Sequence, residues 1–239
     1  SSAASDVYKR QRDALYQEAI KSGYKKEFLE KTGLVIAYED GRVNDRFRGR
    51  VIFPVHSLSG KVVAFGGRVL KKDEKTAKYV NSPESEIYHK SNELYGIYFA
   101  KQAIVKADRC FLVEGYTDVI SMHQAGIDTA VCACGTALTP EQVRLISEYA
   151  DEVILSYDSD EAGQKATLRS LELFRNSPVK VGVLQIPGAK DPDEYIKKYG
   201  AERFKALLDG VGNALDFRLG RLRSQYDLAQ DAQRLEYVK

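Results

Sequence analysis

Three carboxylates stand where two short apolar runs of the sequence end. Glu114 closes the run Phe111-Leu-Val, Asp158 closes the run Leu155-Ser-Tyr, and Asp160 follows two residues later. Acidic groups that lie close together repel one another unless a cation compensates them, and hard cations such as magnesium prefer carboxylate oxygen. Magnesium keeps its other positions for water and substrate phosphate. The three residues therefore predict a divalent metal site for phosphoryl transfer on a nucleic acid, where two metals about 4 Å apart could stabilise the attacking 3′ oxygen and the departing pyrophosphate.

The sequence around these carboxylates alternates apolar runs with helical patterns. Such alternation indicates a parallel sheet covered by helices on both faces. Ligands of such sheets bind beyond the carboxyl ends of the strands, so we expect Glu114, Asp158 and Asp160 to meet at one edge. The expected strands are residues 110–114, 129–134, 153–158 and 180–186, and the expected helices between them are residues 117–125, 140–150 and 162–176.

A simpler interpretation is that Asp158 and Asp160 only cap the helix that begins near Ala162, which is a common use of aspartate. For a lone Asp-x-Asp pair this interpretation would be preferred. Glu114 ends a different buried strand and, like the aspartate pair, is followed by glycine. A purely structural origin would need several coincidences, so the metal site is the better hypothesis.

The first 107 residues have another character. Residues 6–31 have helical spacing with Gly23 as a stop, and residues 51–56 and 61–69 are β-rich runs joined by a turn, which predicts a hairpin. Gly66 and Gly67 suggest a bulge or a close backbone approach in the second strand. A helix is expected over residues 92–106, and residues from 194 onward are helical again. The expected α/β fold therefore has three parts: a mixed α/β basic lobe (1–107), a metal-binding domain with the parallel sheet (108–193) and a C-terminal helical segment (194–239).

Composition limits the class of protein. The chain has 239 residues, 44% of them hydrophobic, which suffices for a sizeable core. Lys and Arg number 36 against 34 Asp and Glu, so the net charge of +2 indicates no partner. Cys110, Cys132 and Cys134 lie in apolar runs without zinc spacing and are expected to be buried free thiols. No membrane-length apolar stretch and no leader is present, so a cytoplasmic protein that contacts no membrane is expected.

The acidic motifs resemble a known superfamily. The runs Glu114-Gly-Tyr-Thr-Asp118 and Asp158-Ser-Asp-Glu-Ala-Gly163 resemble the TOPRIM fold of bacterial primases and topoisomerases. Further runs between residues 44 and 209 resemble the catalytic core of DnaG-type primases. They are Arg50-Val-Ile-Phe-Pro54, Phe65-Gly-Gly-Arg-Val-Leu70, Lys78-Tyr-Val-Asn-Ser-Pro-Glu84, Asn92-Glu-Leu-Tyr-Gly96 and Gly135-Thr-Ala-Leu-Thr139.

This resemblance implies a TOPRIM parallel sheet and an activity. The activity is the joining of ribonucleoside triphosphates into short RNA primers on single-stranded DNA, with Mg²⁺ as cofactor and Mn²⁺ able to substitute, at the bacterial nucleoid. By position, Glu114 resembles the general base and a metal ligand, and Asp158 and Asp160 resemble the principal metal ligands. The supporting acidic residues, also metal ligands by resemblance, are Asp118, Asp191 and Asp193.

Two domains of a complete primase are expected to be missing from this sequence. They are the zinc-ribbon domain upstream and the domain downstream that binds the replicative helicase, so both partners would act through absent regions. An isolated core of this kind is expected to prime weakly and with poor choice of start site.

The basic residues of the first lobe are candidates for nucleotide and template contacts. Arg46, Arg48 and Arg50 recur every second residue, so in an extended chain their guanidinium groups would project from one face. Arginine binds phosphate through a planar fork and lysine as a point charge. The resemblance assigns these contacts to Arg46, Arg68, Lys78 and Lys90, and the candidate set also includes Arg48 and Asn81.

Two other classes of function stay open. Another TOPRIM enzyme is one: a nuclease would nick DNA, whereas a topoisomerase needs a tyrosine nucleophile on a separate domain, for which this chain has no room. A non-catalytic nucleic-acid-binding module, like the TOPRIM recombination mediators, is the other. That module would tolerate the loss of Glu114.

Overall fold

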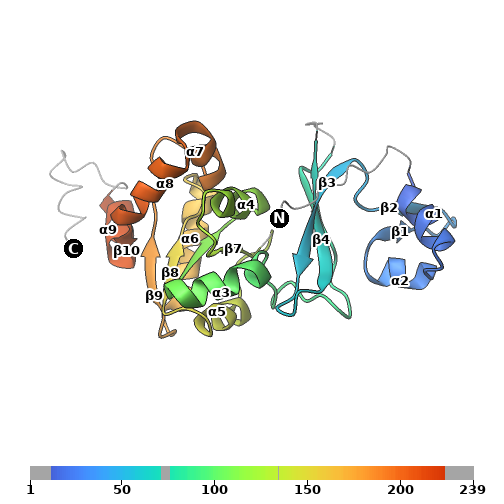
Figure 1. The fold of residues 1–239 in the computed structure, drawn as a ribbon, viewed down its shortest axis with the longest axis horizontal. Helices are drawn as coiled ribbons and strands as arrows, with labels where there is room; N and C mark the ends of the chain where they lie inside the picture. The colour runs from blue at the N-terminus through green and yellow to red at the C-terminus, as the bar shows by residue number, and fades with distance from the viewer. Residues whose placement is uncertain (1–11, 71–75, 134, 224–239) are drawn as a thin grey trace. The chain divides into compact units, whose positions relative to one another are not determined.

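A computed structural model describes residues 12–70, 76–133 and 135–223 of the chain (Figure 1). They form two compact units. Residues up to Tyr98, with residues 135 and 136, make up the first unit, and the remaining described residues from Phe99 onward make up the second. The boundary lies inside one helix. The expected three-part division at residues 107 and 193 stays a prediction.

The first unit begins with two short helices and a two-stranded sheet. The elements are α1 (Ala14–Lys21), α2 (Lys26–Lys31), β1 (Val35–Ala37) and β2 (Val43–Asp45). The helices and β1 bury a small core around Ala19, Leu29 and Val35. The carboxylate of Asp45 accepts the backbone N–H groups of the first two residues after Ala14, at 2.8 and 3.0 Å. The chain turns at Gly23, whose φ of 86° favours glycine, so the predicted helix stop is confirmed and residues 6–11 lie outside the described part.

A three-stranded antiparallel sheet follows. It consists of β3 (Arg50–His56), β4 (Val62–Val69) and β5 (Tyr79–Asn81), in that spatial order, so the predicted hairpin is confirmed. The ladder between β3 and β4 is irregular at Val55 and His56 and regular at Gly66 and Gly67, so a glycine bulge was the wrong interpretation.

Close approach of side chains, rather than of another backbone segment, explains Gly67. A Cβ atom there would lie 2.8 Å from the ring of Phe47 and 2.9 Å from Cδ of Arg50, two side chains packed over β4. Phe47 and Arg50 are both buried, so neither can move away without opening this part of the unit. Glycine therefore makes room for a buried arginine.

The second unit is a five-stranded sheet in the order β10-β9-β8-β6-β7, in which only β10 is antiparallel to its neighbour among the described strands. Val153, Ile154 and Leu155 of β8 are all completely buried, and because successive side chains point to opposite faces, both faces of the sheet are covered. The predicted parallel sheet flanked by helices is confirmed. The strands are β6 (Arg109–Val113), β7 (Ala130–Cys132), β8 (Glu152–Leu155), β9 (Lys180–Val183) and β10 (Gly212–Asn213).

Helices connect and cover these strands (Figure 1). The predicted helix over residues 92–106 begins later, because Gly96 adopts a φ of 90° in a turn before it. The predicted C-terminal helical segment contains α7, α8 and α9 but also a 3₁₀ turn and the short strand β10, and residues 224–239 lie outside the described part. The helices are α3 (Ile97–Ala107), α4 (Tyr116–Gln124), α5 (Pro140–Ser147), α6 (Glu161–Phe174), α7 (Pro192–Tyr199), α8 (Ala201–Leu207), the 3₁₀ turn η1 (Leu208–Gly210) and α9 (Ala214–Arg223).

Two predicted properties can be checked in the described residues. Cys110 and Cys132 are buried free thiols on β6 and β7, as expected, and Cys134 lies outside the described part. None of the described helices has both the length and the apolar character that crossing a membrane requires.

Candidate active site

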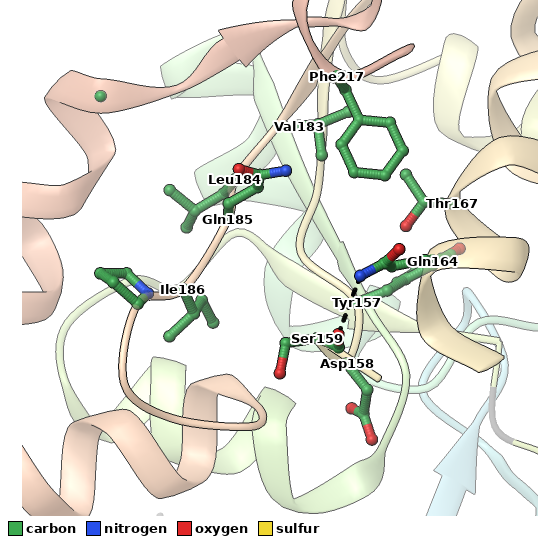
Figure 2. Close-up of a pocket in the computed structure, with 12 residues that line it drawn as sticks. Tyr157, Asp158, Ser159, Gln164, Thr167, Val183, Leu184, Gln185, Ile186 and Phe217 are labelled. Atoms are coloured by element: carbon green, nitrogen blue, oxygen red, sulfur yellow. Dashed lines mark hydrogen bonds between the residues drawn. The ribbon is translucent and has the colours of Figure 1, made fainter. Parts of the chain in front are cut away.

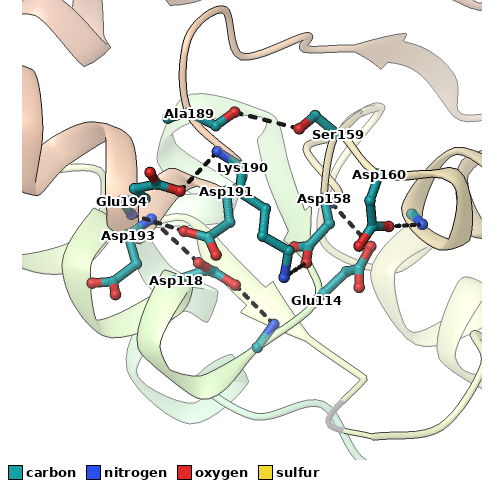
Figure 3. Close-up of polar contacts among 12 residues, drawn as sticks. Glu114, Asp118, Asp158, Ser159, Asp160, Ala189, Lys190, Asp191, Asp193 and Glu194 are labelled. Carbon is teal, nitrogen blue, oxygen red and sulfur yellow. Dashed lines mark hydrogen bonds and ion pairs between the residues drawn. The ribbon is translucent and has the colours of Figure 1, made fainter.

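Glu114 and Asp158 meet at the carboxyl edge of the sheet, where neighbouring strands β6 and β8 end (Figure 3). The backbone N–H of Asp158 donates to Oε1 of Glu114 at 3.0 Å. Both follow their strands in loops, because β6 stops at Val113 and β8 at Leu155, earlier than predicted. The parallel register of β6 and β8 therefore brings these two carboxylates together, as expected from their places in the sequence.

The first turn of α6 closes against this pair. A Cβ atom on Gly163 would lie 2.1 Å from the carbonyl oxygen of Asp158 and 2.8 Å from Oε1 of Glu114, so only glycine fits at this position. Asp160 precedes α6, and its Oδ1 accepts the N–H of Gly163 at 2.9 Å. The capping interpretation thus holds for Asp160 but not for Asp158, whose carboxylate has a different partner.

That partner is Lys190, a residue missing from the predicted site. Its Nζ lies 2.6 Å from Oδ2 of Asp158, and Figure 3 shows the side chain extending from its loop to that carboxylate. The loop is tied to the site by the N–H of Ser159, which donates to the Lys190 carbonyl at 2.9 Å. In the sequence, the feature that could have pointed to Lys190 is its position directly before the predicted acidic pair Asp191 and Asp193.

The other predicted acidic residues hold α4 and α7 together. Asp118 is buried, and its carboxylate accepts the N–H of Gly115 at 3.0 Å and that of Asp193 at 3.2 Å. Asp193 accepts from the hydroxyl of Ser121 and pairs with Lys197 at 2.6 Å. These contacts fix the start of α7 beside the start of α4.

Asp191 lies next to this network. Its Oδ1 accepts the N–H of Glu194 at 2.8 Å and so caps α7. All six predicted acidic residues therefore lie around one edge of the sheet, although several of their oxygens are engaged by backbone N–H groups (Figure 3).

The pKa values of three of these carboxyl groups are raised. Burial is the main cause for Glu114, with the charge of Asp158 second. Burial also raises the pKa of Asp158, although the hydrogen bond from Lys190 opposes it. Burial, followed by the charge of Asp191, raises the pKa of Asp118 to about 7. Burial therefore disfavours the charged form of these carboxyl groups, and a cation bound beside them would offset that cost.

The donor set fits a hard divalent cation by its chemistry. Every candidate ligand is a carboxylate, and oxygen ligands are those that magnesium and manganese prefer. In the arrangement seen for the described residues, however, no three Asp, Glu, His or Cys side chains converge closely enough to hold a metal ion. Asp158 is paired with Lys190 instead. Binding of a metal would therefore require these side chains to rearrange.

A cavity of about 520 Å³ lies beside Asp158 (Figure 2). Its volume falls in the range of small-molecule sites. Gln164 stands in its wall and donates to the carbonyl of Ser159 at 3.2 Å, while Ile186 and Phe217 supply apolar surface. The space next to Asp158 is therefore open and of mixed polarity.

In the first unit, the predicted row of arginines does not form. Residues 46–49 are turns rather than an extended strand, so Arg46, Arg48 and Arg50 do not project from one face. Arg46 donates to the Gly33 carbonyl at 2.7 Å. Arg50 is buried and donates to the carbonyls of Gly67 and Lys78 at 3.1 and 3.3 Å, while burial lowers its pKa. Of the three arginines, Arg48 is the exposed one.

Two other predicted basic residues share an aromatic partner. The guanidinium of Arg68 lies 5.9 Å and the ammonium of Lys78 lies 5.7 Å from the ring centre of Tyr79. Tyr79 was not predicted, although it stands inside the motif that contains Lys78 and Asn81. Asn81 ends β5 and is half-buried, as is Lys90, whose N–H donates to Glu84 at 3.0 Å.

Comparisons with known proteins cover both units. Residues 7–101 match the family model described as DNA primase catalytic core, N-terminal domain, and residues 111–196 match the model described as Toprim-like. The chain is 43% identical to a DNA primase of Clostridium acetobutylicum over 217 residues, which are 91% of this chain and 36% of that protein. It therefore spans about a third of the length of this curated relative.

Solved structures agree in fold. The Escherichia coli primase catalytic core has 35% identity and a TM-score of 0.80, covering 95% of this chain and 72% of that one. The RNA polymerase domain of Mycobacterium tuberculosis primase, in complex with a double-stranded DNA oligomer with a 6-nucleotide overhang, has 32% identity and a TM-score of 0.81, covering 95% and 73%. The predicted TOPRIM fold class is thereby confirmed.

Proposed function

The chain belongs to the family of bacterial DnaG-type DNA primases, and from that membership we propose that it synthesises short RNA primers on single-stranded DNA. In each step the 3′ hydroxyl of one ribonucleotide attacks the α-phosphorus of the next triphosphate. A new phosphorus–oxygen bond forms, and the bond to pyrophosphate breaks. The observation that supports this most directly is the contact between Glu114 and Asp158 at the carboxyl edge of the parallel sheet.

The acidic residues would have different roles in this reaction. Asp158 and Asp160, together with Glu114, would hold divalent metal, which we propose is Mg²⁺ with Mn²⁺ able to replace it. The metal supplies charge stabilisation for the attacking and leaving oxygens. Glu114, whose pKa is raised mainly by burial, is suited to accept the proton of the attacking hydroxyl. Asp118, Asp191 and Asp193 would keep the loop before α7 at this edge through their backbone hydrogen bonds.

The first unit would bind the nucleic acid and the nucleotide. Exposed Arg48, together with Arg68 and Lys78 around Tyr79, are the groups best suited to contact phosphates. Arg46 is less suited because it already donates to a backbone carbonyl, and Asn81 and Lys90 remain candidates. We also propose that the zinc-ribbon domain and the replicative helicase act with this core through regions outside this sequence, in the bacterial cytoplasm.

A primer-synthesis assay tests the proposal. The protein is incubated with single-stranded template, ribonucleotides and Mg²⁺ or Mn²⁺, and short RNA is resolved on a gel. Glu114→Gln and Asp158→Asn should each abolish product while leaving the circular dichroism unchanged. Glu161→Gln is the matched control, because Glu161 begins α6 but pairs outward with Lys165 at 2.6 Å. It should retain activity.

Other outcomes of the same assay would contradict the proposal. Normal product from Asp158→Asn would remove that residue from the reaction. Nicking of the DNA by the unmodified protein would indicate a nuclease, and tight binding without product would indicate a non-catalytic module.

A further inference from the structure

Lys190 places a positive charge inside the acidic cluster. Its ammonium contacts Asp158 at 2.6 Å and interacts electrostatically with Glu114, Asp160 and Asp191 as well. In the view of Figure 3 the side chain reaches down between Asp191 and Glu114. One ammonium therefore occupies the region that a cation bound to these carboxylates would need.

The backbone of Lys190 is held while its side chain stays accessible. Its N–H donates to Oε2 of Glu194 at 3.0 Å, and its carbonyl accepts from the N–H of Ser159 at 2.9 Å. The Lys190 side chain is 51% exposed, whereas the Asp158 side chain beneath it is 14% exposed. The ammonium can thus leave Asp158 toward solvent without any change in the loop that carries it.

We propose that Lys190 is a displaceable counter-cation, which neutralises Asp158 in the metal-free protein and must be pushed aside when a divalent cation binds. The inference rests on the proposed function, because it takes Asp158 as a metal ligand. A magnesium–oxygen contact is about 2.1 Å long, so a metal ion on Oδ2 of Asp158 would lie within a few ångströms of the ammonium, whose nitrogen is 2.6 Å from the same oxygen. Their charges also repel one another at this distance. Lys190 therefore lowers the affinity of the site for metal while it stabilises the empty cluster.

Titration with Mn²⁺ in a calorimeter tests this competition without any substrate. Lys190→Met keeps most of the side-chain length but removes the charge. The matched control is Lys165→Met, which removes the same charge from a half-exposed lysine paired with Glu161 at 2.6 Å on α6. Lys190→Met should bind Mn²⁺ roughly fivefold more tightly than Lys165→Met. A factor of this size corresponds to the free energy of a partly exposed ion pair, which the metal no longer has to break. Equal or weaker binding would overturn the inference.

Thermal unfolding separates competition from a merely structural role. In EDTA, Lys190→Met should melt at a lower temperature than the unmodified protein, because Asp158 loses its counter-charge. In saturating Mn²⁺ the difference should vanish, since the metal replaces the ammonium. If the melting temperature of Lys190→Met is lower by the same amount in EDTA and in Mn²⁺, Lys190 only supports the fold. Lys190→Arg, which retains the charge, should resemble the unmodified protein in both.

The outcomes also distinguish this inference from the proposed function. If the unmodified protein binds no Mn²⁺, both are overturned. If it binds Mn²⁺ and Lys190→Met tightens binding, but no primers are made, the inference is supported and the proposed activity is contradicted. If primers are made and Lys190→Met has the affinity of Lys165→Met, only the inference fails.

Discussion

Two sets of charged residues stand beside the family motifs, the carboxylates of the second unit and the arginines of the first, and the fold uses them differently. Glu114 and Asp158 end neighbouring parallel strands and meet with raised pKa values. Arg46 and Arg50 instead donate to backbone carbonyls, and burial lowers the pKa of Arg50. The carboxylates are held together against their mutual repulsion, whereas these arginines stabilise their own unit.

This difference shows which sequence patterns predict that side chains lie together in the folded protein. The carboxyl ends of parallel strands meet at one edge whatever their side chains are, so topology alone brings Glu114 to Asp158. The spacing of Arg46, Arg48 and Arg50 predicts a shared face only if the chain there is extended, and residues 46–49 form turns. A functional prediction that rests on sheet topology is therefore stronger than one that rests on local conformation.

The largest expected effect concerns pH and metal in the second unit. The pKa of Asp118 rises from its ordinary value of 3.8 to about 7, so its contribution to stability is present below pH 4 and is lost as the pH rises toward 7. At about 1.4 kcal/mol for each pKa unit, this loss is on the order of 4 kcal/mol. Glu114 and Asp158, with raised pKa values, act in the same direction.

Calorimetric melting at pH 5 and pH 8, with EDTA and with Mn²⁺, measures this effect. The gain in melting temperature from Mn²⁺ should be larger at pH 8, because metal compensates charges that protons compensate at pH 5. Because EDTA and Mn²⁺ are compared at the same pH, the contributions of titrating groups outside the site to the melting temperature cancel. An equal gain at both pH values would show that the acidic cluster does not bind the metal.

Gly163→Ala should break the second unit's site without removing a charge. The added Cβ would lie 2.1 Å from the Asp158 carbonyl and 2.8 Å from Oε1 of Glu114, so α6 has to move away from both. A displacement of about 1 Å in a site can cost about a hundredfold in rate, and primer synthesis should fall by that factor. Gly210→Ala is the control, because its Cβ would meet no atom within 4 Å. Similar activities for the two variants would contradict the packing of α6 against the site.

Arg50→Ala tests the structural use of arginine in the first unit. It removes two hydrogen bonds to the carbonyls of Gly67 and Lys78 and leaves a cavity beside Gly67 of β4. The free energy of unfolding should fall by about 2 kcal/mol. Arg48→Ala, at an exposed position in the preceding turn, should change it by less than about 0.5 kcal/mol. Urea unfolding measures both, and equal losses would contradict the different roles assigned to the two arginines.

Much of the second unit follows from sequence because its strands are buried on both faces. The predicted strand over residues 153–158 runs past the end of β8 at Leu155. The pairing with β6 continues for one more residue, because the N–H of Ser156 donates to the Leu112 carbonyl at 2.9 Å. Strand β10 was missed because Gly212 and Asn213 form no apolar run. Lys190 was missed because its role depends on how the loop before α7 folds, and the conformation of a loop cannot be predicted from hydrophobic periodicity.

The smallest expected effect concerns the cations around Tyr79. Arg68 and Lys78 lie 5.9 and 5.7 Å from the ring centre, and an exposed cation–π contact contributes about 0.5–1 kcal/mol. Loss of an interaction of this size should raise the KM for nucleotide or the Kd for template about twofold to fivefold in Arg68→Ala, while Mn²⁺ binding by the second unit stays unchanged. Arg42→Ala is the control, because Arg42 lies 5.4 Å from the ring centre of Tyr38 in the same unit but outside the family motifs. If Arg68→Ala and Arg42→Ala weaken template binding equally, as measured by fluorescence anisotropy, the phosphate contact assigned to Arg68 is wrong, and its charge acts only through the general field of the first unit.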